Sequence, residues 1–219
     1  IKMAPVVLAL QEASEKVQPI VCLTAQHREL LDQVIRSFNL PVSYDLNIMT
    51  PGQTLVEITS RILERLSEII VDIKPDVVLV HGDTTTTLSS ALASFYQKIP
   101  IGHVEAGLRT YDKYHPFPEE INRRLVDAMG DFLYAPTEQA KKNLLSEHIE
   151  EYKIIVTGNT GIDALLYIAE KPYQFQDELL SRLGKERRLI ILTAHRRESF
   201  GKPMDEIFHA VSDLVDKND

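Results

Sequence analysis

Along most of the chain, short apolar runs alternate with longer segments in which apolar residues recur every three or four positions. The short runs predict strands, and the run introduced by Pro75 is typical of a strand buried on both faces. The predicted strands are at 20–25, 75–83, 100–106, 132–137 and 152–159. The longer segments predict helices with one face towards a core. The predicted helices are at 1–16, 27–39, 54–74, 84–98, 119–130, 138–148 and 161–171.

The succession of strand and helix is typical of a mostly parallel, doubly wound sheet, so the predicted fold class is α/β. Residues 1–170 are predicted to form a Rossmann-like domain whose first strand is missing, because a helix already stands at the start. Charge, Pro and Gly at 171–188 interrupt the alternation and predict an interdomain passage. A strand at 189–195 and a helix at 204–217 then predict that 189–219 is the truncated start of a second domain.

The composition narrows the classes of function. With 219 residues, 44% hydrophobic and 26% charged, the chain has an ordinary globular composition. A net charge of -8, with scattered Lys and Arg, argues against a nucleic-acid partner and requires a local basic cluster for any anionic ligand. The single Cys22 predicts a buried thiol and a reducing, cytoplasmic location. No apolar stretch approaches eighteen residues, which gives no support for a membrane partner.

Polar residues gather where the predicted strands end, which is the edge at which open α/β sheets bind ligands. His81 and Asp83 follow one strand, His103 and Glu105 lie on the next, and His195 with Arg196 and Arg197 ends the strand of the second domain. Two alternatives stay open at this point: Asp83 or Thr84 caps a helix, and Glu105 forms a salt bridge to Arg109. The functional interpretation takes Arg109 and His103 as positive charges for a phosphorylated ligand.

Glu119 stands in the first turn of a predicted helix, where a carboxylate also suits the helix dipole. It is fourteen residues past Glu105, so the loop can return it to the same edge. Convergence with Asp83 and Glu105 would separate their pKa values, as acid and base pairs require. Metal, dinucleotide and hydrolase motifs (paired Cys, H-E-x-x-H, G-x-G-x-x-G, G-x-S-x-G) are missing, so neither metal nor cofactor is predicted.

The segments IKMAPVV, TAQHRELLDQV, PDVVLVHGDTTTT, GHVEAGLRT, PFPEEINRR, TGNTGIDAL and TAHRRES, in this order, closely resemble bacterial non-hydrolysing UDP-N-acetylglucosamine 2-epimerases. The resemblance runs over the full chain. It implies a two-domain GT-B-like fold, a UDP-sugar in the interdomain cleft and a homodimer. The implied reaction interconverts UDP-N-acetylglucosamine and UDP-N-acetylmannosamine, for cell-surface polysaccharide precursors, without metal or nicotinamide. The family eliminates UDP across C1–C2 and adds it back to 2-acetamidoglucal.

Roles carry over from the family by motif. Asp83, Glu105 and Glu119 match its acid/base carboxylates, Lys2 its phosphate-side lysine, and His195 with Arg196 its cleft residues. Gln26 and His27 match an allosteric site at which some members bind a second UDP-N-acetylglucosamine. The family's first strand and the later half of its second domain have no counterpart here, which predicts an inactive fragment. Alternatives are an epimerase on another UDP-sugar, a hydrolysing relative, a GT-B glycosyltransferase and a nucleotide-sugar-binding protein.

Overall fold

A computed structural model gives the fold of the chain. The residues that it describes are 1–24, 28–48, 50, 52–175, 177–186, 190, 192–194 and 201–217. The chain divides into two compact units, Ile1–Lys171 and Pro172–Asp219.

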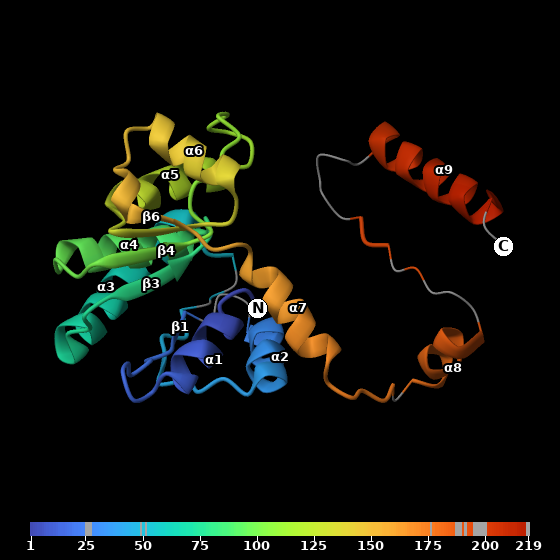
Figure 1. Cartoon of the computed structure of the whole chain (residues 1–219), viewed down its shortest axis with the longest axis horizontal. Helices are drawn as coiled ribbons and strands as arrows, with labels where there is room; N and C mark the ends of the chain where they lie inside the picture. Colours follow the sequence, from blue (N-terminus) through green and yellow to red (C-terminus); the bar gives the residue numbers. More distant parts are fainter. Residues whose placement is uncertain are drawn as a thin grey trace. The chain divides into compact units, whose positions relative to one another are not determined.

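Two parallel sheets form the centre of the first unit (Figure 1). The larger sheet has the order β3-β4-β5-β6, with strands Val78–His81, Ile101–Val104, Phe132–Ala135 and Ile154–Val156. The smaller sheet pairs β1 (Cys22–Leu23) with β2 (Tyr44–Asp45). Every pairing in both sheets is parallel, which confirms the predicted α/β fold class.

The predicted helices of the first unit are confirmed, with ends that are a few residues shorter. They are α1 (Ala4–Glu12), α2 (Arg28–Phe38), α3 (Leu55–Ile73), α4 (Thr85–Tyr96), α5 (Glu119–Met129), α6 (Glu138–Ser146) and α7 (Thr160–Ala169), and a short 3-10 helix spans Glu151–Lys153. In α3 a capping box between Thr54 and Glu57 satisfies the first backbone N–H groups. Lys74, in a left-handed conformation, ends this helix.

The apolar stripe of α3 lies in the main core of the first unit. Its buried members are Ile58, Ile62, Leu66 and Ile70. Strand β3, by contrast, was predicted to be buried on both faces, and this is wrong because only Val80 of the strand is buried. Among the described residues β3 pairs with β4 alone, so it is an edge strand. Edge strands keep one side open, which explains the partial exposure of its side chains.

Three helices from distant parts of the sequence share a small core beside β1 (Figure 1). Ala4 of α1, Phe38 of α2 and Ala164 of α7 are its buried members. The rings of Phe38 and Tyr167 stack with centroids 5.2 Å apart. This packing places the start of α1, and with it Lys2, next to the start of α7.

The second unit contains α8 (Glu178–Glu186) and α9 (Lys202–Lys217). Helix α9 confirms the predicted helix at 204–217, whereas α8 lies where an interdomain passage was predicted. The described part of the predicted strand 189–195, Ile190 and 192–194, forms no strand, and the rest lies outside the described residues. An isolated strand is unstable without a partner, and none is described in this unit. Within the described ranges, no helix is long and apolar enough to cross a membrane.

Candidate active site

The ends of β3 and β4 bring two of the predicted carboxylates to neighbouring positions. His81 pairs with Val104 in the sheet, and the Gly82 N–H donates to the Val104 carbonyl at 3.0 Å. Both chains then turn out of the sheet through left-handed residues, Gly82 at φ 71° and Glu105 at φ 71°. This conformation is uncommon for a glutamate, and such residues concentrate at functional sites where the surroundings hold them.

Glu105 is the centre of a cluster built from four separate segments. Its Oε1 atom accepts hydrogen bonds from Lys2 Nζ at 2.5 Å and from Asn159 Nδ2 at 3.3 Å. Its Oε2 atom lies 3.3 Å from His81 Nε2. Lys2 precedes α1, Asn159 caps α7, and His81 ends β3. The fold therefore gathers polar groups from both ends of the first unit around one carboxylate.

The surroundings of Glu105 keep it ionised. The His81 ring and the Lys2 ammonium lower the pKa of Glu105 to about 2, against the opposite effect of burial. The contact with His81 is long, and His81 Nε2 has no well-aligned hydrogen-bond partner among the described residues. The Lys2 side chain is 40% exposed. The cluster thus combines an anionic carboxylate and an imidazole whose Nε2 atom is buried with an exposed ammonium that can take a further partner.

Asp83, on the neighbouring loop, is held by α5. Arg123 Nη2 lies 2.8 Å from Asp83 Oδ2, and Asn122 donates to the Asp83 carbonyl at 2.9 Å. The capping alternative holds for Thr84, whose Oγ1 accepts from the Thr87 N–H at 3.2 Å, and not for Asp83. The Asp83 carboxylate is therefore an ion-paired group that is 30% exposed.

The two glutamates that begin α5 have different surroundings. Glu120 is fully buried, and its carboxylate accepts the N–H groups of Thr110 and Tyr111, each at 3.0 Å. Glu119 is half-buried, and its side chain has no hydrogen bond or ion pair with a described residue. No such contact joins Glu119 to Glu105 or Asp83, so its convergence on them stays a prediction.

Arg109 was predicted either to form a salt bridge to Glu105 or to offer a positive charge to a phosphorylated ligand, and both predictions are wrong. Its side chain is fully buried, and it pairs with Asp127 and Glu147 at 2.8 Å each instead of Glu105 or an exposed ligand site. His103 is likewise fully buried and is not available to a phosphate. The reason is that α5 and the end of α6 supply carboxylates beneath the loop, and a buried cation must be paired. Sequence reasoning missed these partners, although polar residues on the buried face of α5 are a signal for them.

Several predicted site residues lie outside the described residues, namely His195, Arg196, Gln26 and His27. In the described ranges, no three His, Cys, Asp or Glu side chains are grouped as metal ligands would be. Cys22 is half-buried, and burial together with nearby Asp45 raises the pKa of its thiol to about 11. Cys22 therefore stays protonated at neutral pH, as expected of an unreactive thiol.

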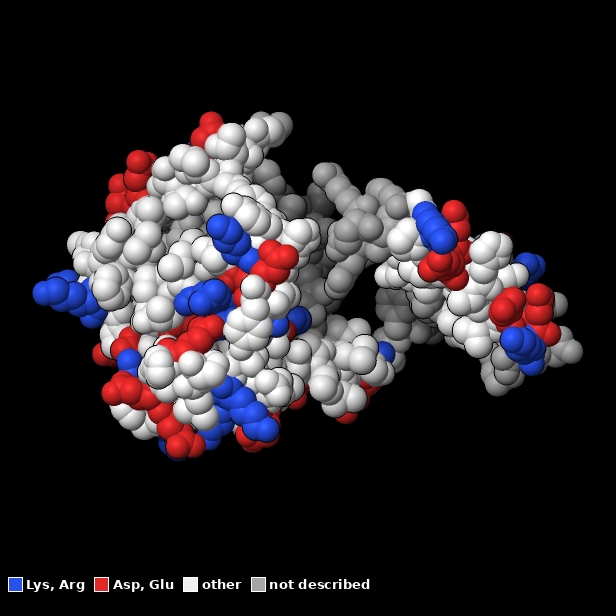
Figure 2. Space-filling model, turned by 90° about the horizontal axis from the view of Figure 1, so that it is seen from above, with Lys and Arg blue, Asp and Glu red and all other residues white. Residues whose placement is uncertain are grey.

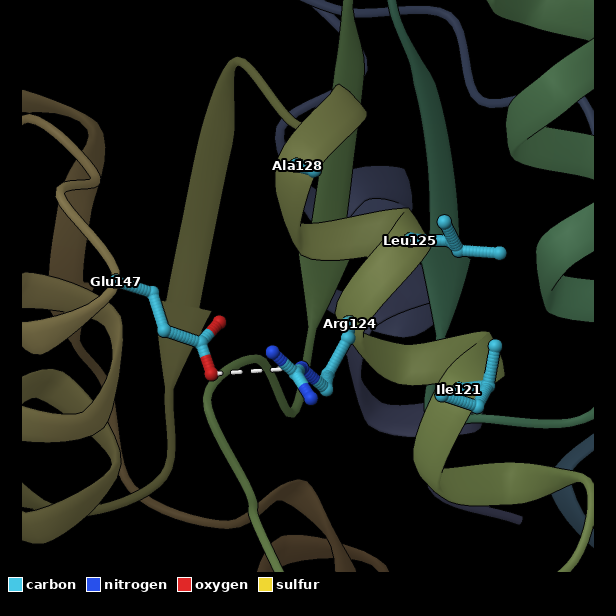
Figure 3. Close-up of a pocket in the computed structure, with 5 residues that line it drawn as sticks. All are labelled: Ile121, Arg124, Leu125, Ala128 and Glu147. Carbon is cyan, nitrogen blue, oxygen red and sulfur yellow. Dashed lines mark ion pairs between the residues drawn. The ribbon is translucent and has the colours of Figure 1, made fainter. Parts of the chain in front are cut away.

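A hollow lies beside α5, and none of the residues that line it belongs to the Glu105 cluster (Figure 3). It has a volume of about 580 Å³ and is lined by Ile121, Arg124, Leu125, Ala128 and Glu147. Arg124 points across it to Glu147, at 3.5 Å, whereas Ile121 and Leu125 point away from this pair. On the face seen in Figure 2, basic and acidic side chains are interspersed. An anion at that face would therefore depend on individual cations.

A parallel α/β fold with ion-paired carboxylates at its strand ends is typical of α/β proteins that bind ligands at this edge of the sheet. The family model for UDP-N-acetylglucosamine 2-epimerase matches residues 9–219, and the chain belongs to this family. The family resemblance inferred from the sequence motifs is thereby confirmed.

Individual relatives agree with this membership. The UDP-N-acetylglucosamine 2-epimerase of Escherichia coli K12 is 52% identical over 222 residues, which cover 98% of this chain and 58% of that protein. A Listeria monocytogenes relative aligns with a TM-score of 0.89 at 52% identity, over 99% of this chain and 56% of that one. The Neisseria meningitidis enzyme, solved with UDP-GlcNAc, aligns with a TM-score of 0.72 at 58% identity, over 76% and 45%.

The chain spans a little over half the length of the curated relatives that it matches. The solved relatives have the two-domain, GT-B-like architecture that the motifs implied, and this chain covers about half of it.

Proposed function

We propose that the complete protein interconverts UDP-N-acetylglucosamine and UDP-N-acetylmannosamine, and so supplies precursors for cell-surface polysaccharides. The observation that carries this proposal is the Glu105 cluster, found at the strand ends of a chain that belongs to the epimerase family. Glu105 is ionised and can therefore accept a proton, and Lys2 beside it is a cation that can stabilise charge on a diphosphate.

The proposed reaction is an elimination followed by an addition. A carboxylate takes the C2 proton while the C1–O bond to UDP breaks, and the C2–H electrons form the double bond of 2-acetamidoglucal. The UDP oxygen then adds back to C1, and a proton returns to the opposite face of C2. Two groups on opposite faces of the sugar are needed, and we assign them among Asp83, Glu105 and Glu119. Lys2, His195 and Arg196 are proposed to hold the diphosphate, because cations stabilise the charge that develops on the leaving UDP.

Deuterium exchange tests this reaction. In D₂O, the complete protein should place deuterium at C2 of the product sugar, as followed by NMR. Retention of the original C2 hydrogen would contradict the elimination. Accumulation of UDP and free sugar, without the second UDP-sugar, would instead indicate a hydrolysing enzyme. A boiled sample and a UDP-glucose substrate, which lacks the acetamido group, serve as controls.

A homodimer is the assembly that we propose for the complete protein, in line with the family resemblance. The outer face of α5 is our candidate interface, because Ile121 and Leu125 are 38% and 47% exposed there. Leu125→Asp should shift the mass measured by light scattering from dimer to monomer. Val71→Asp, at an apolar position of α3 that is 55% exposed, is the matched control. A monomeric wild type would contradict the dimer.

We place the enzyme in the cytoplasm, since UDP-sugars are made there and the thiol of Cys22 needs no oxidising compartment.

We also propose Gln26 and His27 as contacts of an activating second UDP-sugar. Sigmoidal dependence of rate on UDP-N-acetylglucosamine, lost on Gln26→Ala, would support that role, whereas hyperbolic kinetics in the wild type would exclude it.

A further inference from the structure

His103, on β4, occupies an unusual position for a histidine in a protein core. Its side chain is completely buried, and both ring nitrogens have partners. Nδ1 lies 2.6 Å from Asp127 Oδ1, and Nε2 lies 2.8 Å from the Gly82 carbonyl oxygen. A carbonyl oxygen only accepts hydrogen bonds, and so does an ionised carboxylate. A neutral imidazole has one N–H, so it would leave a lone pair facing one of these acceptors.

The surroundings of Asp127 fix where the second proton belongs. Its other oxygen, Oδ2, accepts the Gly107 N–H at 3.2 Å and Arg109 Nη1 at 2.8 Å. Arg109 also binds both oxygens of Glu147, at 2.9 and 2.8 Å. With a protonated His103, these four side chains carry two positive and two negative charges, and the half-exposed Arg124 lies 3.5 Å from Glu147 at the surface. Buried charges are tolerated when they are balanced and hydrogen-bonded in this way.

We propose that His103 is a permanently protonated positioning residue that joins the loop of Asp83 to the loop of Glu105. One N–H of the imidazolium holds the Gly82 carbonyl, next to Asp83, and the other holds Asp127, which holds the Gly107 N–H two residues past Glu105. The positioning role rests on the proposed function, because it assigns both loops to catalysis. The protonation state does not depend on it.

The backbone at both attachment points explains why such a clamp is needed. Gly82 and Gly107 have φ values of 71° and 85°, and Glu105 between the clamped positions is also left-handed. A side chain at Gly107 would stand 2.4 Å from the Ala140 carbonyl, so this loop has little freedom on its other side. Conformations of this kind persist only where the surroundings over-determine them. The His103–Asp127 pair provides this support from inside the sheet.

Histidine NMR on the complete protein tests the protonation state directly. With ¹⁵N-labelled histidine, the His103 ring, assigned by its loss in His103→Gln, should show two protonated nitrogens that do not change between about pH 5.5 and 9. An unperturbed imidazole changes its charge within this range. Asp127 is the charged group in contact with the ring, and Arg109 and Glu147 are linked to the ring through it, so Asp127→Asn should convert the His103 signal to a neutral form. A neutral or titrating ring in the wild type would refute the proposal.

Kinetics test the positioning role. His103→Gln should lower kcat at least about 10-fold while the Kd for UDP changes less than about 3-fold, because the loops and not the nucleotide contacts are displaced. His209→Gln, at an exposed position of α9, is the control. Equal kcat in His103→Gln and wild type would refute positioning. If the wild type has no epimerase activity but shows the imidazolium signal, the proposed function fails and the clamp's protonation stands.

Discussion

Two clusters of charged residues lie at the same end of the sheet. They differ in how far their side chains are buried and paired with one another. In the cluster of Arg109, Asp127, His103 and Glu147, the first three side chains are 0% or 1% exposed and all are paired. In the cluster of Glu105, the cation Lys2 is 40% exposed and His81 Nε2 has no well-aligned partner among the described residues. The cluster of Arg109, which we call the closed cluster, suits a structural role. In the cluster of Glu105, which we call the open cluster, the exposed Lys2 can exchange its partner for a ligand.

The largest effect is expected when a charge is removed from the closed cluster. Arg109→Met removes the arginine that pairs with the buried Asp127, and breaking a buried pair typically costs about 3–5 kcal/mol. We expect a loss of that size in urea denaturation of the complete protein. Arg36→Met, at the end of α2, is the control for losing an arginine. A loss below about 1 kcal/mol would show that the closed cluster is not structural.

Glu105→Gln and Glu119→Gln test two of the proposed acid/base carboxylates. Each keeps the shape of the side chain but removes its ability to carry a proton, so kcat of the complete enzyme should fall about 10²-fold or more. Binding of UDP should change much less. Glu151→Gln, which removes an exposed pair with Lys141, is the matched control. Full activity in both site variants would leave Glu105 as an ion pair and Glu119 as a helix-dipole residue.

Lys2→Met compares two lysine–glutamate pairs directly. Lys2 and Lys141 each contact one glutamate, at 2.5 and 2.7 Å. Only Lys2 lies in the proposed site, so Lys2→Met should lower kcat/KM about 10²-fold while Lys141→Met should leave it unchanged. Steady-state kinetics on both variants decide the matter, and similar values for the two would remove Lys2 from the site.

The smallest expected effect concerns pH. The pKa of Glu105 is about 2 in the folded protein against an ordinary value of 4.5, so its ionised form stabilises the fold above about pH 4.5. That contribution is lost as the pH falls from 4.5 towards 2. The difference in unfolding free energy between wild type and Glu105→Gln should therefore shrink over this range. A difference that stays constant would show that Glu105 is not held by its neighbours.

The fold could be predicted from the sequence because it depends on periodic burial. Helix α3 has 19 residues with four buried members on one stripe, and its capping box marks the start, so its predicted range 54–74 differs little from Leu55–Ile73. Strand β2 has only two residues, too few for an alternating pattern, and was not predicted. The burial of β3 was overestimated because the number of its neighbouring strands is a tertiary property that a local pattern does not contain.

The candidate site was predictable as a location but not as a set of partners. Strand ends in a parallel sheet meet at one edge, and this brought His81 within 3.3 Å of Glu105, with Asp83 on the loop that follows His81. Arg109 pairs instead with Asp127 and Glu147, which lie 18 and 38 residues further along the chain, in α5 and at the end of α6. Nothing in the spacing favours these over Glu105. The position of Asp127 on the buried face of α5 would have been the available hint.

The left-handed backbone at Glu105 has an evolutionary consequence. Glycine adopts this conformation without the cost that a glutamate bears, so a library selected only for a folded product should enrich glycine at position 105. A library selected for growth that depends on the enzyme's sugar product should retain glutamate. The two selections would then differ at position 105. The difference in glycine frequency there would measure how much stability the protein loses by keeping a glutamate for its chemistry.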